Sequence, residues 1–107
     1  MKKFHLALSV TSISETVADY TKKLGQAPVL VIKDSYALWR TQTLNVSVKC
    51  DPAKAGHLRH LGWEDPSAEE FSVHRDVNGI EWEQFSAQNQ TDEINRLWPD
   101  VKFKPQA

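Results

Sequence analysis

The feature that most constrains the fold is a strand pattern near the N-terminus that is followed at once by a helix pattern. From Phe4 to Val10, apolar residues alternate with small or polar ones. This period of two predicts a β-strand whose apolar face packs under a helix. Ser12 and Glu15 then have the spacing of a helix-capping box, and Gly25 is placed to end that helix in the left-handed conformation.

Three further strands are expected in the first half of the chain, over residues 29–33, 36–41 and 44–50, where β-branched and aromatic residues alternate with polar ones. The order β-α-β-β-β therefore describes residues 1–50 as one module. Residues 51–56 contain Pro and Gly, and they are expected to form a linker.

The second half has fewer elements. Strands are expected over residues 57–64 and 71–76 and over Gly79 to Phe85, and the last two are joined by a hairpin turn at Asn78-Gly79. The segment between the first two strands, residues 65–70, has room for a single helical turn.

Residues 88–90 are polar and are interpreted as a linker, after which Thr91 is expected to cap a last helix over residues 91–98. The chain is therefore predicted to be one α+β domain over residues 1–107, with a first module at 1–50, a shortened second module at 57–86 and a C-terminal helix at 91–98.

Composition excludes several classes of protein. A formal net charge of -1 without a basic patch argues against a nucleic-acid partner. No apolar run approaches the roughly 18 residues that a membrane span requires. Cys50 is the single cysteine, so no internal disulfide is possible, and the N-terminus lacks the layout of a signal peptide. We expect a cytoplasmic protein.

The last strand raises the question of a metal site. Alternation places Glu81, Glu83 and Phe85 on one face, where a half-buried carboxylate needs a partner or a cation. His5 and His60 lie on the less apolar faces of two other expected strands. Two imidazoles and one carboxylate suit Fe(II), Mn(II), Ni(II) or Zn(II) with open coordination positions.

From the residues alone, other interpretations stay open. His5, His60 and Glu83 could each be a hydrogen-bonded polar group on a sheet, and Glu81 could be the true ligand or a partner of the ligand. Alternation places His57 and Arg59 on the face opposite His60, so His57 is expected at the rim of any site.

Further candidates are aromatic or titratable. Tyr36, Trp39 and Phe85 could line a pocket for a planar or apolar ligand, although aromatic residues on paired strands also form cores. His74 could act as an acid or base or be an exposed hairpin residue. The chain has no glycine-rich phosphate loop, nucleophile elbow or cysteine-rich zinc pattern.

An ordered set of short motifs carries a resemblance to a known family. The motifs are Tyr36-Ala37-Leu38-Trp39, His60-Leu61-Gly62 and Asn78-Gly79-Ile80-Glu81-Trp82-Glu83, after the first strand and helix. The chain resembles the vicinal oxygen chelate superfamily, which includes glyoxalase I, bleomycin-resistance proteins and extradiol dioxygenases, and most closely the branch of cadmium-induced proteins and organoarsenical lyases. The resemblance covers residues 4–86. It implies a glyoxalase-like fold and puts His5, His60 and Glu83 at the metal-ligand positions.

Two departures from the family pattern limit this resemblance. Between Glu64 and Phe71 the family has a full helix and another strand, and it is there that the arsenic lyases carry a cysteine pair, so arsenic chemistry is not expected. The C-terminal helix is expected to cover the sheet face that the lost helix leaves bare. Pairing into a homodimer that completes the barrel is the other expected compensation.

Two functions from different classes follow. The first is a metal-dependent lyase, isomerase or dioxygenase that acts on a small oxygenated substrate. The second is a non-catalytic module, similar to the bleomycin-resistance proteins, that binds a small molecule without chemistry. Tyr36, Trp39, Phe85 and Glu81 are the expected substrate contacts in either case.

Overall fold

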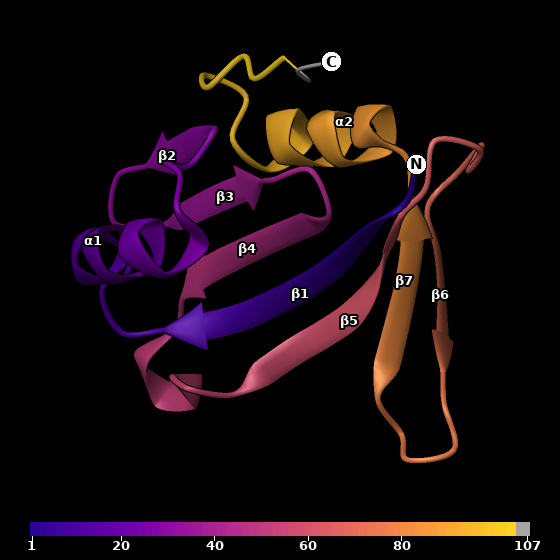
Figure 1. Ribbon diagram of the computed structural model, residues 1–107, viewed down its shortest axis with the longest axis horizontal. Coiled ribbons are helices and arrows are strands. Elements are labelled where there is room, and N and C mark those ends of the chain that lie inside the picture. Colours follow the sequence, from indigo (N-terminus) through magenta and orange to yellow (C-terminus); the bar gives the residue numbers. More distant parts are fainter. Residues whose placement is uncertain (105–107) are drawn as a thin grey trace.

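The computed structural model describes residues 1–104; the last three residues of the expected domain, 105–107, lie outside the described residues. The elements in chain order are β1 (Lys3–Val10), α1 (Ile13–Leu24), β2 (Leu30–Ile32), β3 (Tyr36–Arg40), β4 (Leu44–Cys50), the 3₁₀ turn η1 (Pro52–Lys54), β5 (Leu58–Glu64), β6 (Ser72–Arg75), β7 (Glu81–Phe85) and α2 (Ala87–Leu97). The strands form one sheet in the order β2-β3-β4-β1-β5-β7-β6 (Figure 1). The predicted α+β class, a βαβββ module with a short C-terminal helix, is confirmed. No helix in residues 1–104 has the length and apolarity to span a membrane.

β1 lies in the middle of the sheet and joins the two halves of the chain. It pairs in parallel with β4 and antiparallel with β5. β5 in turn pairs in parallel with β7, which is antiparallel to β6. The arrangement of β5, β7 and β6 therefore repeats that of β1, β4 and β3. Residues 65–71 form turns and loop, without the expected helical turn.

α1 forms for the reasons that its sequence suggests. The Ser12 hydroxyl accepts a hydrogen bond from the Glu15 amide at 3.2 Å, and Gly25 ends the helix at φ 75°. The apolar stripe of the helix packs on one face of the sheet, in a core that includes Trp39 and Val48. This burial fixes α1 against β3 and β4.

α2 begins at Ala87, so the prediction of a polar linker at residues 88–90 is wrong. The Ser86 hydroxyl accepts from the Asn89 amide, and the Asn89 side chain accepts from the Ser86 amide. This reciprocal pair is a capping box with Asn in place of the usual Glu or Gln. Gln90 and Thr91 are consequently buried in the helix rather than lying before it.

α2 also lies on a different face of the sheet from the one expected. Ile94 packs with Tyr36 and Leu38, which alternate along β3 with the residues that face α1. The prediction that the C-terminal helix covers the bare face is therefore wrong, since α2 packs on the face opposite α1.

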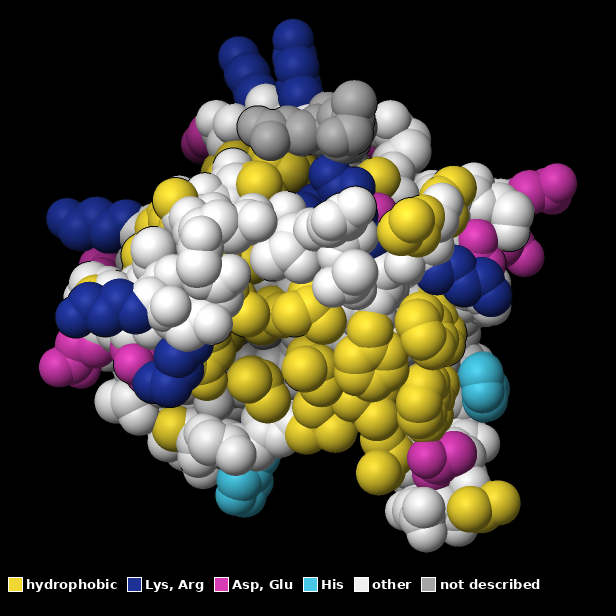
Figure 2. Space-filling model, viewed as in Figure 1, with side chains coloured by type: hydrophobic (Ala, Val, Ile, Leu, Met, Phe, Trp, Pro, Cys, Tyr) yellow, Lys and Arg dark blue, Asp and Glu magenta, His cyan; other side chains and the backbone are white. Residues whose placement is uncertain are grey.

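The face of the sheet that carries α1 is partly apolar where that helix does not cover it. Figure 2 shows hydrophobic side chains gathered in the region of β5 and β7 on this face. Phe4 makes edge contacts with Trp63 at 5.2 Å and with Trp82 at 6.3 Å between ring centroids. Trp63 remains 39% exposed.

Gly62 allows β5 and β7 to approach each other closely. It is paired with His5 on one side and with Glu83 on the other. A Cβ atom at this position would lie 2.0 Å from the carbonyl oxygen of Glu83, which is far inside any permitted contact. The absence of a side chain is therefore a requirement of the strand pairing.

We predict that Gly62→Ala destabilises the protein more than Gly25→Ala does. Alanine at Gly25 meets open space and only the left-handed backbone penalty of about 1 kcal/mol. Alanine at Gly62 must displace the backbone of Glu83, at a cost of about 3 kcal/mol or more. Urea unfolding of both variants measures the difference, and equal losses would contradict the role given to Gly62.

Candidate metal centre

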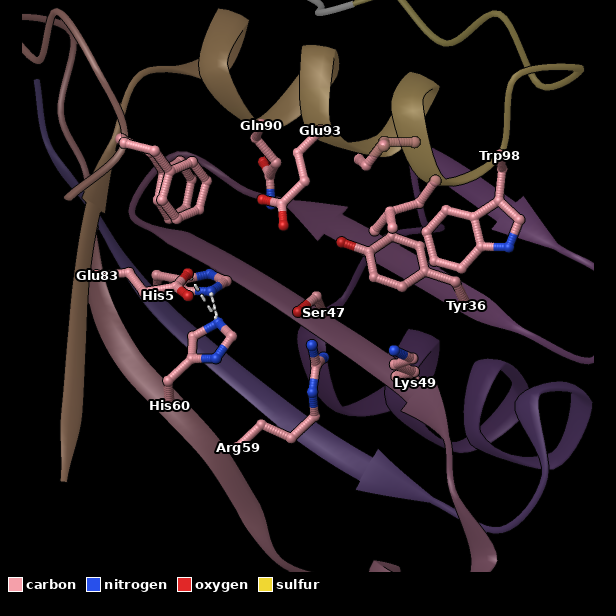
Figure 3. A pocket seen from close by; sticks show the side chains of 14 residues that line it. His5, Tyr36, Ser47, Lys49, Arg59, His60, Glu83, Gln90, Glu93 and Trp98 are labelled. Atoms are coloured by element: carbon pink, nitrogen blue, oxygen red, sulfur yellow. Dashed lines mark hydrogen bonds and ion pairs between the residues drawn. The ribbon is translucent and has the colours of Figure 1, made fainter. Parts of the chain in front are cut away.

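Three side chains from three strands converge at one point (Figure 3). They are His5 of β1, His60 of β5 and Glu83 of β7. The two Nε2 atoms of the histidines are 3.0 Å apart, and Glu83 Oε1 lies 3.0 Å from His60 Nε2. One ligand atom from each residue lies within 4.8 Å of the others. Because Gly62 separates His5 from Glu83 in the sheet register, no intervening side chain prevents this approach.

The ring of His5 is held in one tautomer. Its Nδ1 atom lies 2.9 Å from Asn45 Oδ1 and 3.1 Å from the Asn45 carbonyl oxygen. Both neighbours are acceptors, so Nδ1 carries the proton and donates to them. The Nε2 lone pair is therefore directed toward His60 and Glu83, as a metal ligand requires.

A buried polar network supports this orientation. The Asn45 side-chain amide donates to Glu64 Oε1 and to Gln90 Oε1, each at 2.8 Å. Arg40 donates two parallel hydrogen bonds of 2.8 Å to the carboxylate of Glu64. Burial opposes ionisation of Glu64, but the hydrogen bonds from Arg40 and Asn45 keep its pKa below the ordinary value. Each side chain of this network therefore has hydrogen-bond partners within it.

His5 is neutral at pH 7. Burial and, to a smaller extent, the neighbouring His60 lower the pKa of His5 to about 4, against the opposing effect of Asn45 and Glu83. Only the neutral form of an imidazole can ligate a metal ion, so the site does not have to release a proton from His5 to bind one.

The geometry and chemistry of the three donors fit a divalent ion. Nitrogen atoms that occupy neighbouring positions at about 2.0–2.1 Å from one ion are about 3 Å apart, which matches the two imidazoles. The lone pair of His5, the Glu83 carboxylate and the His60 ring can lie this close together only with a hydrogen-bond donor or a cation between them. The N–H group of His60 or a metal ion can fill that role. These residues could therefore hold a metal ion.

A cavity of about 200 Å³ opens beside the three donors. Figure 3 shows that the strands form one side of it, while α2 extends Gln90 and Glu93 into it from the other. Six further residues that line it supply two hydroxyl groups, two cations, a carboxylate and an indole ring. They are, in that order, Tyr36 and Ser47, Lys49 and Arg59, Glu93, and Trp98. Positions left open on an ion would therefore face a mixed polar and aromatic cavity.

Of the four expected substrate contacts, Tyr36 and Phe85 line this cavity. Burial raises the pKa of Tyr36 to about 12, so its hydroxyl stays protonated, and it is hydrogen-bonded to Ser47. The hydroxyl of Tyr36 is therefore a donor over the physiological pH range.

Trp39 and Glu81 do not lie in the cavity. Trp39 is fully buried with α1, because it alternates with Tyr36 along β3 and so points to the other face. Glu81 shares the face of Glu83 but lies two residues away at the start of β7, where its half-exposed side chain pairs with Arg75 at 3.4 Å. His57 and His74 are exposed.

Arg59 lies in the cavity, so the prediction that it faces away from His60 is wrong. The register between β1 and β5 passes from Ala7 opposite His60 to Leu8 opposite Leu58, and Arg59 is left unpaired. Such a bulge turns two successive side chains to the same face. Strict alternation in the sequence gives no signal of it.

Other residues of the site could have been found by their pattern. Asn45, Ser47 and Lys49 alternate with Val46 and Val48, so they share the face of β4 that lines the cavity. Gln90 was hidden because its segment was interpreted as a linker. The capping signal at Ser86 is the observation that would have included it in a helix.

Comparisons with known proteins show the fold alone. No family model matches the chain, and no curated protein matches it. A solved structure described as an NAD-dependent benzaldehyde dehydrogenase from Legionella pneumophila superposes with a TM-score of 0.53 at 12% sequence identity. The match covers 78% of this chain and 97% of that chain. At this identity the likeness concerns the arrangement of elements.

We predict that metal-free protein loses stability as the pH falls from about 6.5 to about 4. His5 has an ordinary pKa of 6.5 and a folded pKa of about 4, so in this window the unfolded chain binds the extra proton. The stability is fully present above pH 6.5, and about 3 kcal/mol is lost as the pH reaches 4. Urea unfolding in the presence of a chelator measures this slope. His5→Gln should flatten it and His74→Gln serves as the control; an unchanged slope in His5→Gln would contradict the assignment.

Proposed function

We propose that this protein is a cytoplasmic, divalent-metal-binding member of the vicinal oxygen chelate superfamily that acts on a small oxygenated substrate. The observation that carries the proposal is the convergence of His5, His60 and Glu83 at one end of a cavity. The ordered motifs of the sequence and the repeated strand arrangement around β1 add support. The reaction is a lyase, isomerase or dioxygenase reaction.

The donor set favours certain ions. Two imidazoles with one carboxylate and open positions are typical of Fe(II) in oxygenases and of catalytic Zn(II), and Ni(II) or Mn(II) also accept these donors. A bound ion would act as a Lewis acid toward substrate oxygens or, if it is iron, support oxygen chemistry.

The residues of the chain supply the rest of the site. The protonated hydroxyl of Tyr36, next to Ser47, can donate a hydrogen bond to a substrate oxygen. Glu93 is a carboxylate of the cavity lining outside the proposed ligand set, and it is our candidate for a base toward the substrate.

A second candidate function is binding without catalysis. The observation that favours it is the aromatic part of the cavity lining, which includes Tyr36, Phe71, Phe85 and Trp98. Such a surface can hold a planar or apolar ligand by contact alone. In this case the stability of the protein would be indifferent to chelators, whereas a resident metal ion stabilises the native state that binds it.

We predict that protein purified without a polyhistidine tag contains close to one equivalent of Fe, Ni, Mn or Zn, and that His60→Ala loses it. Removal of one of three ligands should weaken binding by at least tenfold. Elemental analysis measures the metal, and calorimetry follows its uptake after chelation.

His74→Ala is the matched control, because His74 is an exposed histidine outside the cavity. Chelation should lower the melting temperature of the wild type and of His74→Ala but leave that of His60→Ala unchanged. Absence of metal from the wild type, with no uptake of added Fe(II), Ni(II), Mn(II) or Zn(II), would exclude the proposed function.

We also propose a homodimer in which a second copy covers the apolar face of β1, β5 and β7. Support comes from the 39% exposure of Trp63 beside Phe4 and Trp82. Light scattering after gel filtration should give twice the chain mass. Trp63→Ser should shift the protein toward the monomer, and a monomeric wild type at all concentrations would refute the dimer.

A further inference from the structure

Arg59 has an unusual place in the cavity. It is the bulged residue of β5, so it lies on the same side of the sheet as His60. Figure 3 shows its side chain extending from β5 in the direction of Ser47, and it lines the same cavity as the three candidate ligands. A bulge next to a site is a common means of turning a side chain into it.

The guanidinium of Arg59 has unused hydrogen-bonding capacity. Its Nη1 atom is buried and has no hydrogen-bond partner among the residues that the structure describes. None of the ion pairs within residues 1–104 includes it. A buried cationic donor without a partner is costly, so its retention in a cavity points to a ligand that provides the acceptor.

The surroundings of Arg59 favour an anionic acceptor. Lys49 is a second cation of the cavity lining and is also absent from the ion pairs of the described residues. The two cations balance Glu83 and Glu93, so a bound divalent ion leaves the cavity with a net positive charge. The hydroxyl groups of Tyr36 and Ser47 add donors on the same wall.

We propose that Arg59 and Lys49 form an anion subsite, which binds a carboxylate or phosphate group of a small ligand. The planar fork of an arginine matches the paired oxygens of either group. The cavity has a volume of about 200 Å³, which is below the range of about 300–1,000 Å³ typical of sites for drug-sized molecules. It therefore suits a small metabolite. The same ligand would place neighbouring oxygens on the metal ion. This part of the inference rests on the proposed function.

The subsite can be tested with defined probes. Malonate and inorganic phosphate supply the two kinds of anion, and malonamide is the uncharged match of malonate. Calorimetry on the full chain, both chelator-treated and reloaded with Zn(II), gives the dissociation constant of each probe. We expect malonate or phosphate to bind and malonamide not to bind, and the anion that binds more tightly identifies the group of the natural ligand.

Variants distinguish the effect of Arg59 on anion binding from the effect of the general surface charge. Arg59→Gln should weaken anion binding by at least tenfold, because it removes a charge-assisted pair of hydrogen bonds. Lys49→Gln should have a smaller effect. Arg75→Gln is the matched control, since Arg75 lies on β6 outside the cavity and should leave binding unchanged.

Thermal unfolding without ligand shows whether the Arg59→Gln variant is folded. Since Nη1 of Arg59 has no protein partner, Arg59→Gln should unfold at the wild-type temperature or above it while losing the shift that the anion produces. If Arg59→Gln does not fold, Lys49→Gln and the salt dependence of wild-type binding provide the same test.

The outcomes distinguish this proposal from the proposed function. Anion binding that depends on Arg59 in protein that takes up no metal would support the subsite and refute the metal function. Metal uptake with anion affinity equal in wild type, Arg59→Gln and Lys49→Gln would overturn the subsite and leave the metal function intact. Equal affinity for malonate and malonamide would also overturn it.

Discussion

The buried side-chain amide of Asn45 connects most of the elements that surround the candidate site. Its oxygen accepts from His5 on β1, and its nitrogen donates to Glu64 on β5 and to Gln90 on α2. Glu64 is in turn held by Arg40 on β3. A buried amide of this kind is tolerable only when all its hydrogen bonds are made, so the positions of these elements depend on one another. The orientation of His5 is one consequence.

Two departures from regular pairing in β5 complete the site. Gly62 lets the backbones of β5 and β7 approach and leaves open the space in which His5 and Glu83 converge. The bulge at Arg59 places a cation next to His60 instead of on the far face. A strand with uniform alternation would carry His60 alone into the cavity. The irregularity of β5 therefore brings the three candidate metal ligands and a positive charge to one place.

The connection between β5 and β6 contains no helix, and α2 packs on the other face of the sheet. Residues 65–71 leave no helix to cover β5 and β7 on the face of α1, and that face stays partly apolar. α2 packs on the opposite face, against Tyr36 and Leu38, because Ile94 finds its apolar contacts there. Gln90 thereby enters the Asn45 network, and Glu93 enters the cavity. A helix packed on the same face as α1 would have contributed neither Gln90 nor Glu93 to the site.

Local sequence patterns were sufficient to define most of the elements and the faces of most strands. Alternation in β1, β4 and β7 and the caps of α1 depend on neighbouring residues, so the positions of His5, Ser47 and Glu83 on the cavity face follow from them. The capping box at Ser86 and the alternation that puts Trp39 on the face opposite Tyr36 are local signals of the same kind. The face on which α2 packs and the placement of Arg59 were set only by the tertiary structure. Each of these depends on pairing register or on packing between distant segments, where a shift of one residue reverses the face of a side chain.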